Sequence, residues 1–316
     1  MSATPEPAAG LVPDMTTTRN ASALTAHGTH KDAFTLADWG LLGGIALIWG
    51  SSFLFITIGL DAFQPGVVTL ARLVLGAGAL ALVPAARRPI DPVDRTRVAA
   101  LGIIWMAIPL SLFPIAQQWI DSSVAGMING AVPITAAVWA TILMRRLPGR
   151  RQLLGIAIGF TGMVLIFLPE LGDSSATVFG TGLVVLAVAM YGLSSNMAVP
   201  LQQRYGAAPV LLRAQLVAMA VVAPIGLFQV PGSSWAWDSA LAMVPLGVLG
   251  TGLALVLMTN LVGRVGSTRG SVAIYFVPVV AIILGVVVRH ESIHAIAGVG
   301  MALILIGAWV TSRREH

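Results

Sequence analysis

The 316-residue chain is too apolar for an ordinary soluble domain, because 57% of its residues are hydrophobic and only 10% are charged, whereas soluble domains carry about 25% charged residues. The absence of cysteine excludes disulfides, thiolate metal sites and thiol nucleophiles. A net charge of +5 and a pI of 10.7 do not indicate nucleic-acid binding, because the basic residues stand in short clusters between apolar runs.

A membrane-spanning helix needs about 20 mostly apolar residues, and such segments follow one another after a polar tail. The tail, residues 1–35, has no signal-peptide pattern and is expected to be a disordered cytoplasmic segment. The expected spans are 38–60, 66–85, 98–119, 123–144, 151–169, 178–200, 208–229, 239–262, 268–288 and 294–312. The sequence therefore predicts an all-α polytopic membrane protein with ten transmembrane helices.

The basic residues are distributed unequally between the two sides of the membrane. With a cytoplasmic N-terminus, the cytoplasmic segments hold 15 of the 18 Lys and Arg residues, and the opposite loops hold only Arg289. Acidic residues, including Asp61 and Asp121, fall in those opposite loops instead. This asymmetry follows the positive-inside rule. It predicts a bacterial inner-membrane protein with both termini in the cytoplasm.

The two halves of the chain are related in sequence. One alignment of the halves pairs Pro133 with Pro278, and a slightly shifted one pairs the segment around Arg72 with the segment around the neutral Gln215. We expect one five-helix repeat in residues 36–170 and another in residues 171–316. Because each repeat has an odd number of helices, the two enter the membrane in opposite directions. Inverted repeats are typical of transporters that bind solute near the bilayer midplane.

Several short motifs occur in a fixed order along the chain. Residues 46–53 read Ala-Leu-Ile-Trp-Gly-Ser-Ser-Phe, Arg72 lies inside the second expected helix, and Pro133 lies within the segment 125–137. Together these features resemble the EamA-type transporters of the drug/metabolite transporter superfamily, and the pattern of the fourth and fifth helices recurs in residues 267–309. The glutamate that often follows the fourth helix in this family is matched by Glu291 in the second half, but Arg146 replaces it in the first.

That resemblance covers roughly residues 38–312. It implies a ten-helix bundle with a central cavity that moves small metabolites or drugs, often outward. It also implies that helices 1, 3, 4, 6, 8 and 9 line the path.

Polar and aromatic residues within the expected helices are candidates for a solute-binding wall. Arg72 is the most costly of them in a membrane. It is either an anchor for an anionic group or part of a gate pair that faces the cavity, or else a snorkelling or structural arginine held by backbone carbonyls of neighbouring helices. Each of the others either binds the solute or forms a hydrogen bond to a neighbouring helix. The candidate substrate-binding residues are Trp49, Ser52, Arg72, Gln117, Asn129, Tyr191, Ser195, Asn196, Asn260 and Tyr275.

Prolines and glycines suggest mechanical roles. Pro133 and Pro278 are expected about halfway along the fourth and ninth helices, where each removes a backbone hydrogen bond and creates a hinge or a static kink. Glycines in the fifth and tenth helices, such as Gly155 and Gly307, indicate close packing against a neighbouring helix or a partner chain.

No catalytic or metal-binding pattern accompanies these features, and no cofactor is expected, because all five histidines lie in the tail, in a loop or near a helix end. We predict a secondary transporter, working as an exporter, that moves small metabolites and amino-acid-like or drug-like solutes by alternating access. Its partners would be a small-molecule substrate and the lipid bilayer, with the chain acting as a monomer or homodimer. The alternative is a non-transporting membrane scaffold or assembly subunit. No carboxylate occupies an expected helix centre, so we expect facilitated transport or weak coupling through other groups.

Overall fold

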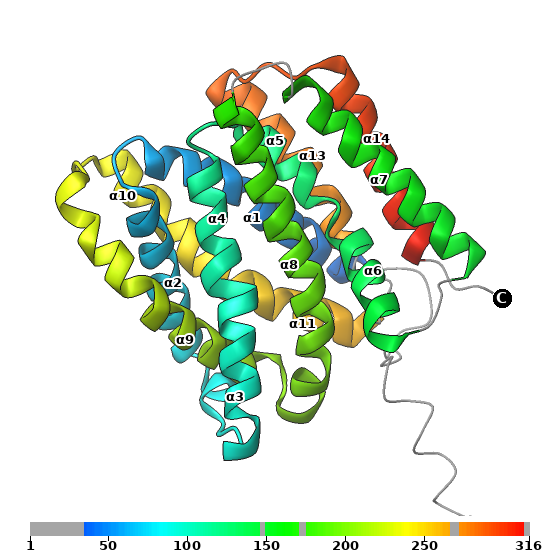
Figure 1. Ribbon diagram of the computed structural model, residues 1–316. Helices are drawn as coiled ribbons and strands as arrows, with labels where there is room; N and C mark the ends of the chain where they lie inside the picture. The colour runs from blue at the N-terminus through cyan, green and yellow to red at the C-terminus, as the bar shows by residue number, and fades with distance from the viewer. Residues whose placement is uncertain (1–34, 146–148, 171–174, 266–271, 313–316) are drawn as a thin grey trace, which may run out of the picture.

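A computed structural model describes residues 35–145, 149–170, 175–265 and 272–312, and within these ranges it contains helices and no strands (Figure 1). The first half contains α1 (Leu36–Leu60), α2 (Pro65–Ala81), η1 (Pro84–Arg87), α3 (Pro92–Leu101), η2 (Gly102–Ala107), α4 (Ile108–Ala116), α5 (Ser122–Asn129), α6 (Val132–Met144) and α7 (Arg150–Glu170). The second half contains α8 (Ser175–Tyr205), α9 (Ala207–Phe228), η3 (Val230–Gly232), α10 (Trp237–Val244), η4 (Pro245–Leu253), α11 (Ala254–Val265), α13 (Val272–Arg289) and α14 (Ala295–Ser312).

The length and composition of the helices agree with a membrane protein. Among the described residues, six helical stretches are long and apolar enough to cross a bilayer: Leu36–Leu60, Pro92–Ala116, Ser122–Leu143, Thr177–Tyr205, Ala207–Phe228 and Trp237–Met258. Four shorter apolar helices, Pro65–Ala81, Leu153–Ile166, Ala273–Arg289 and Ala295–Gly307, coincide with the other expected spans. The all-helical fold is thus confirmed, while the count of ten membrane-crossing helices stays a prediction.

Local sequence signals explain where individual helices begin. Thr35 and Asp38 form a capping box before α1, in which the Asp38 carboxylate accepts from the Thr35 backbone N–H at 2.9 Å. Pro65 and Pro92 occupy the first turns of α2 and α3, where a missing N–H has no cost.

The third and eighth expected spans share an irregularity. In each of them a π-helical segment, η2 or η4, interrupts an otherwise continuous helix. The segments begin at Gly102 and Pro245, which are paired by the same alignment of the two halves that pairs Arg72 with Gln215. Such wide turns disturb the regular backbone hydrogen bonding and are frequent at functional sites.

The fourth and ninth expected spans differ from each other. The fourth is broken between α5 and α6, so Pro133 lies in the first turn of α6 and not halfway along a continuous helix. Proline is tolerated there because the first turn has no partner for its N–H. Pro278 does lie inside α13, and it packs on the break, since a Cβ added to Gly130 would be 2.8 Å from the Pro278 Cγ.

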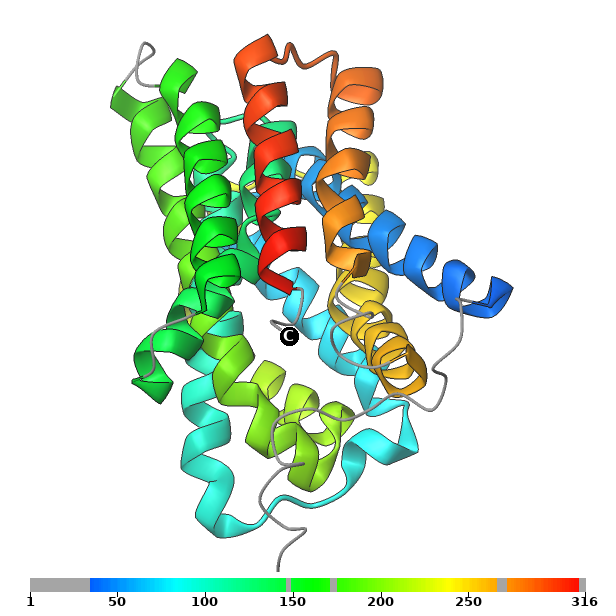
Figure 2. The same cartoon turned by 90° about the vertical axis from the view of Figure 1, so that its right-hand side faces the viewer.

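Glycines hold α7 and α14 side by side at one edge of the molecule (Figures 1 and 2). A Cβ on Gly162 would lie 2.5 Å from the Gly300 carbonyl oxygen, and a Cβ on Gly307 would lie 2.6 Å from the Gly155 carbonyl oxygen. The expected partner of the fifth helix is therefore the tenth helix of the same chain.

Helices from the two halves also pack directly against each other elsewhere. The pairs are α1 with α13, α2 with α9, α4 with α8 and α6 with α8. The largest buried apolar cluster includes Phe53, Phe113, Val188 and Val277, which come from both halves. The centre of the molecule is therefore an interface between the repeats.

Candidate functional site

Side chains from three helices converge on the π-helical segment η4. The Trp49 indole of α1 donates to the Gly250 carbonyl at 3.1 Å. The Arg72 Nε of α2 donates to the Thr251 hydroxyl at 3.3 Å, and the Gln215 amide of α9 donates to the Thr251 carbonyl at 2.7 Å. We call these five residues the η4 polar cluster.

Small residues make this convergence possible, because they let the α2 and η4 backbones approach closely. A Cβ on Gly76 would lie 2.8 Å from the Thr251 Cβ, and a Cβ on Gly247 would lie 3.0 Å from the Arg72 carbonyl oxygen. A larger side chain at either position would push the two helices apart. The reach of Arg72 to Thr251 therefore depends on both glycines.

Arg72 carries the charge of the cluster. The residue is only 6% exposed, and among the described residues no carboxylate forms an ion pair with it. Tyr191 of α8 packs against the buried apolar cluster that includes Leu73, the residue after Arg72. A buried charge without a counter-ion is costly, and an anionic group brought by a solute would compensate for it.

An aromatic wall extends from Tyr191. Its ring stacks on Phe113 of α4 with centroids 5.9 Å apart, and Phe113 meets Phe53 of α1 edge-on at 5.5 Å. The Gln117 amide donates to the Phe53 carbonyl at 3.2 Å. In the part of the chain that the structure describes, the buried Oε1 atoms of Gln117 and Gln215 have no hydrogen-bond partner. Each offers an acceptor to a donor group.

The two serines in the candidate set bond within their own helices. Ser52 donates to the Ile48 carbonyl at 2.9 Å, and Ser195 donates to the Tyr191 carbonyl at 2.6 Å. Ser52 nevertheless faces the η4 polar cluster, since a Cβ on Gly250 would be 2.8 Å from its hydroxyl oxygen.

The remaining candidates lie in different surroundings. Asn196 donates to the Ala136 carbonyl of α6 at 3.0 Å and so links α6 to α8. Tyr275 of α13 is 8% exposed in the apolar core, and Asn129 is half-buried at the end of α5. Asn260 is exposed and donates to the Val256 carbonyl, one turn earlier in α11, at 3.0 Å.

The structure thus gathers Trp49, Ser52, Arg72, Gln117 and Tyr191 around η4 and the aromatic wall. Sequence reasoning missed Thr251 and Phe113. The alignment of the two halves could have pointed to Gln215, because it pairs this residue with Arg72. Nothing in the sequence pointed to Thr251, because its role depends on the π-helical turn. The assignment of any of these residues to solute binding stays a prediction.

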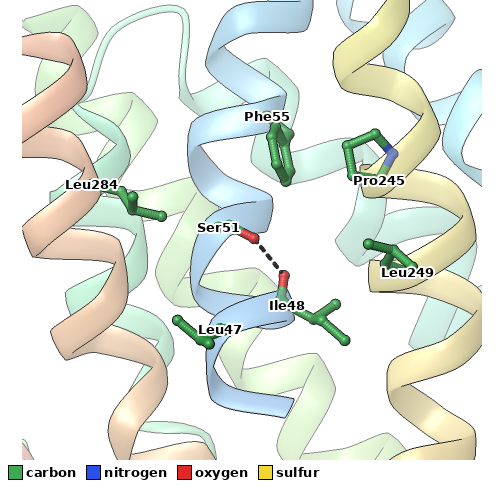
Figure 3. Close-up of a pocket in the computed structure, with 7 residues that line it drawn as sticks. All are labelled: Leu47, Ile48, Ser51, Phe55, Pro245, Leu249 and Leu284. Atoms are coloured by element: carbon green, nitrogen blue, oxygen red, sulfur yellow. Dashed lines mark hydrogen bonds between the residues drawn. The ribbon is translucent and has the colours of Figure 1, made fainter. Parts of the chain in front are cut away.

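A separate apolar groove of about 230 Å³ lies between α1, η4 and α13 (Figure 3). Its lining consists of Leu47, Ile48, Ser51, Phe55, Pro245, Leu249 and Leu284. The Ser51 hydroxyl donates to the Ile48 carbonyl at 3.1 Å, as the dashed line in Figure 3 shows. This groove carries no charged group, so it lacks the chemistry that the η4 polar cluster offers to a polar solute.

Polar contacts between the repeats also occur at the two ends of the bundle. At one end, Arg204 of α8 contacts Asp91 and Asp94, each at 2.8 Å. At the other end, Arg289 forms an ion pair with Asp61 at 2.9 Å. These ion pairs tie the end of α8 to the start of α3, and the end of α13 to the end of α1.

Glu291 reinforces the second of these ends by accepting from the backbone N–H groups of Ser122 and Ser123, both at 2.9 Å. It therefore caps the start of α5 from the opposite repeat. Desolvation, followed by the negative charge of Glu291, raises the pKa of the Asp121 carboxyl. The corresponding first-half position, Arg146, lies outside the described residues.

The model of the EamA-like transporter family matches this chain twice, over residues 39–168 and 178–313. The chain belongs to that family. Its members are transporters and not enzymes, so the family resemblance drawn from the sequence is confirmed and the chain is a multi-pass membrane transporter. The two matches also support the two-repeat architecture.

Individual relatives agree with this assignment. The chain is 23% identical over 275 residues to the uncharacterized transporter YoaV of Bacillus subtilis, covering 85% of this chain and 94% of that protein. It is 25% identical over 285 residues to a probable terminal-alkyne amino-acid exporter of Streptantibioticus cattleyicolor, covering 88% and 94%. It is 25% identical over 282 residues to the uncharacterized inner membrane transporter YedA of Escherichia coli, covering 84% and 88%.

A solved crystal structure shares the fold. It superposes with a TM-score of 0.61 at 19% sequence identity, and the match covers 87% of this chain and 97% of that one.

Proposed function

We propose that this chain exports small amino-acid-like or drug-like solutes across a bacterial inner membrane. The observation that carries the proposal is the buried Arg72 guanidinium, which has no carboxylate partner among the described residues and lies between helices of both repeats. A solute carboxylate would neutralise it through charge-assisted hydrogen bonds. The aromatic wall of Tyr191 and Phe113 would contact the apolar body of the same solute.

Two further observations support the class of solute and the direction. One relative carries the name of a probable amino-acid exporter and matches over most of its length. Arg72 is the single cation in the η4 polar cluster, which suits one carboxylate better than a multiply charged phosphate ester.

The proposed mechanism is alternating access between two inverted five-helix repeats, with ten helices and both termini in the cytoplasm. The distribution of 15 basic residues on one side and one on the other supports this topology. The ion pairs at opposite ends of the bundle, Arg204 with Asp94 and Arg289 with Asp61, are candidates for contacts that open and close in turn. The transporting unit of this proposal is a monomer or a homodimer.

The first experiment is counterflow in proteoliposomes with a panel of apolar amino acids, their amides and drug-like amines. We expect exchange of at least one amino acid, whereas persistent silence across the panel would support the alternative scaffold role.

The role of Arg72 in solute binding is tested by the Arg72→Gln variant in the same assay. Loss of a charge-assisted bond should lower the apparent affinity for the transported amino acid by about tenfold or more, with the protein still folded. Arg213→Gln is the matched control, because Arg213 also lies in a helix but donates to the carbonyls of Ala86 and Pro209. Failure of the Arg72 variant to fold would favour the structural interpretation of Arg72.

Energy coupling is tested by imposing a pH gradient on the same liposomes. We propose facilitated transport or weak coupling, because the described residues of the η4 polar cluster and aromatic wall include no carboxylate. A strong dependence of uptake on the gradient would overturn this part of the proposal.

A further inference from the structure

We infer that Thr251 holds Arg72 and Gln215 in one site, in which Arg72 binds a carboxylate and Gln215 binds an ammonium group. The site would therefore select solutes that carry both groups. The inference rests on the proposed function and specifies its substrate class. Its first basis is the relationship between the repeats. Arg72 and Gln215 occupy equivalent positions in α2 and α9, yet both bond to the same residue of the second repeat.

The first repeat offers no equivalent of Thr251. The alignment that pairs Arg72 with Gln215 places Ile108 at that position, directly after the π-helical segment η2. An isoleucine side chain has no hydroxyl to accept from an arginine, as the Thr251 hydroxyl does from Arg72. The site is therefore one-sided, although the two repeats have related sequences.

The bonds of Thr251 fix which groups stay free. Its hydroxyl donates to the Leu246 carbonyl at 3.1 Å and accepts from the Arg72 Nε at 3.3 Å. A guanidinium has five N–H donors, so occupation of Nε leaves the four N–H groups on the two Nη atoms. Together these can hold a carboxylate through two parallel bonds.

Gln215 supplies the acceptor for the ammonium group. Its Nε2 donates to the Thr251 carbonyl at 2.7 Å, and its Oε1 atom is the only acceptor of the side chain. That oxygen has no partner among the described residues, and Gln215 is fully buried at 0% exposure. An unpaired buried acceptor is costly, and an ammonium group on the solute would satisfy it.

Counterflow with three probes of one carbon skeleton tests the inference. The probes are L-leucine, leucinamide, which lacks the carboxylate, and 4-methylpentanoate, which lacks the ammonium group. We expect wild-type protein to prefer leucine to each of the other two by about tenfold or more. Equal transport of leucine and 4-methylpentanoate would overturn the role of Gln215.

The variants separate the roles of the three residues. Gln215→Leu should lose the preference over 4-methylpentanoate but keep the preference over leucinamide, and Arg72→Gln should do the reverse. Thr251→Val removes the hydroxyl that holds Arg72 but keeps the backbone carbonyl that holds Gln215. It should therefore raise the KM for leucine by about tenfold with little change in maximal rate and weaken the preference over leucinamide, while Thr251→Ser should restore both. Thr69→Val is the matched control, because Thr69 is a buried threonine on α2 whose hydroxyl donates to the Pro65 carbonyl at 2.9 Å.

The outcomes distinguish this inference from the proposed function. If wild-type protein transports no solute of the wider panel, the proposed function fails and the inference fails with it. If leucine is transported and Arg72→Gln impairs it, but Thr251→Val keeps the wild-type KM and preferences, only the inference on Thr251 fails. If Thr251→Val lowers the transport rates of all three probes equally, Thr251 has a structural role, and the inference on Thr251 is overturned as well.

Discussion

Single side chains in this molecule use backbone carbonyls of other helices as hydrogen-bond acceptors. Trp49 bonds to Gly250, Gln117 to Phe53, and Asn196 to Ala136. In lipid, where water does not compete for these groups, each such bond joins two helices, although the measured contribution averages only about 0.6 kcal/mol. The stability of the bundle is therefore spread over many weak contacts.

The Trp49 bond can be tested by Trp49→Phe, which removes the indole N–H and keeps an aromatic ring. We expect a loss of unfolding free energy of about 1 kcal/mol, seen as a lower Tm in detergent. Trp237→Phe is the control, because Trp237 is 70% exposed in the described structure. An equal shift for the two variants would contradict a specific role for the Gly250 contact.

The acidic pair at the start of α5 predicts a pH effect. The pKa of Asp121 is raised by desolvation and by Glu291, so its ionisation destabilises the folded state. The stability that this group contributes is present below its unfolded pKa of about 3.9 and is lost as the pH rises through the higher folded pKa.

Asp121→Asn should therefore increase the Tm at neutral pH and flatten its decline as the pH rises above about 4. The comparison is the difference in Tm between variant and wild type across that range, because other carboxylates titrate in both proteins. A difference that does not change with pH would contradict the assignment.

At the scale of helices, glycine contacts decide how closely two backbones pack. The α7 and α14 pair has glycines at its crossing, and α2 meets η4 through Gly76 and Gly247. A Cβ that approaches a backbone oxygen to 2.5 Å forces the helices apart, which in a packed interior costs about 1–3 kcal/mol. Adding a Cβ to a glycine that faces open space has no such cost.

Gly162→Ala should therefore lower the unfolding free energy by about 1–3 kcal/mol, because the new Cβ would lie 2.5 Å from the Gly300 carbonyl oxygen. Gly298→Ala on α14 is the matched control, since no heavy atom within 4 Å would meet its Cβ. The measurement is Tm in detergent. Similar Tm values for the two variants would show that the helices can separate without cost.

The same comparison on α2 addresses transport. Gly76→Ala places a Cβ 2.8 Å from the Thr251 Cβ, whereas Gly78→Ala meets no heavy atom within 4 Å. We expect Gly76→Ala to weaken the Arg72–Thr251 bond and to lower the apparent affinity for the transported amino acid about tenfold, with Gly78→Ala close to wild type. Counterflow of both variants is the measurement, and wild-type kinetics for Gly76→Ala would contradict the prediction.

At the scale of the whole molecule, contacts between the repeats lie at both ends and at the centre. Alternating access requires that the contacts at one end break while those at the other persist. The absence of cysteine from the chain makes single introduced cysteines specific probes of that change.

We expect Asp61→Asn, which removes the ion pair with Arg289, to raise severalfold the labelling rate of a cysteine introduced at Thr57, one turn before the end of α1. Asp91→Asn is the control, since it weakens the contact with Arg204 at the opposite end. Equal labelling in both variants would contradict a separate role for the two ends.

Much of this architecture could be predicted from the sequence by itself. Hydropathy located the apolar helices, the distribution of Lys and Arg suggested the orientation, and the motif around Trp49 and Arg72 indicated the family that the comparisons confirmed. These are local properties, because the cost of placing a residue in lipid depends mainly on that residue and its neighbours in the chain.

Which polar residues meet depends on how the helices pack in three dimensions. The sequence placed Arg72 and Asn260 in one candidate set, but Arg72 lies buried against Thr251 and Asn260 is exposed on α11. That difference depends on the rotation of each helix about its axis, on glycines that let α2 approach η4, and on a π-helical turn that hydropathy does not register. The helix rotations, the glycine contacts and the π-helical turn all depend on packing between helices that are far apart in the sequence. No single segment of the chain therefore predicts them.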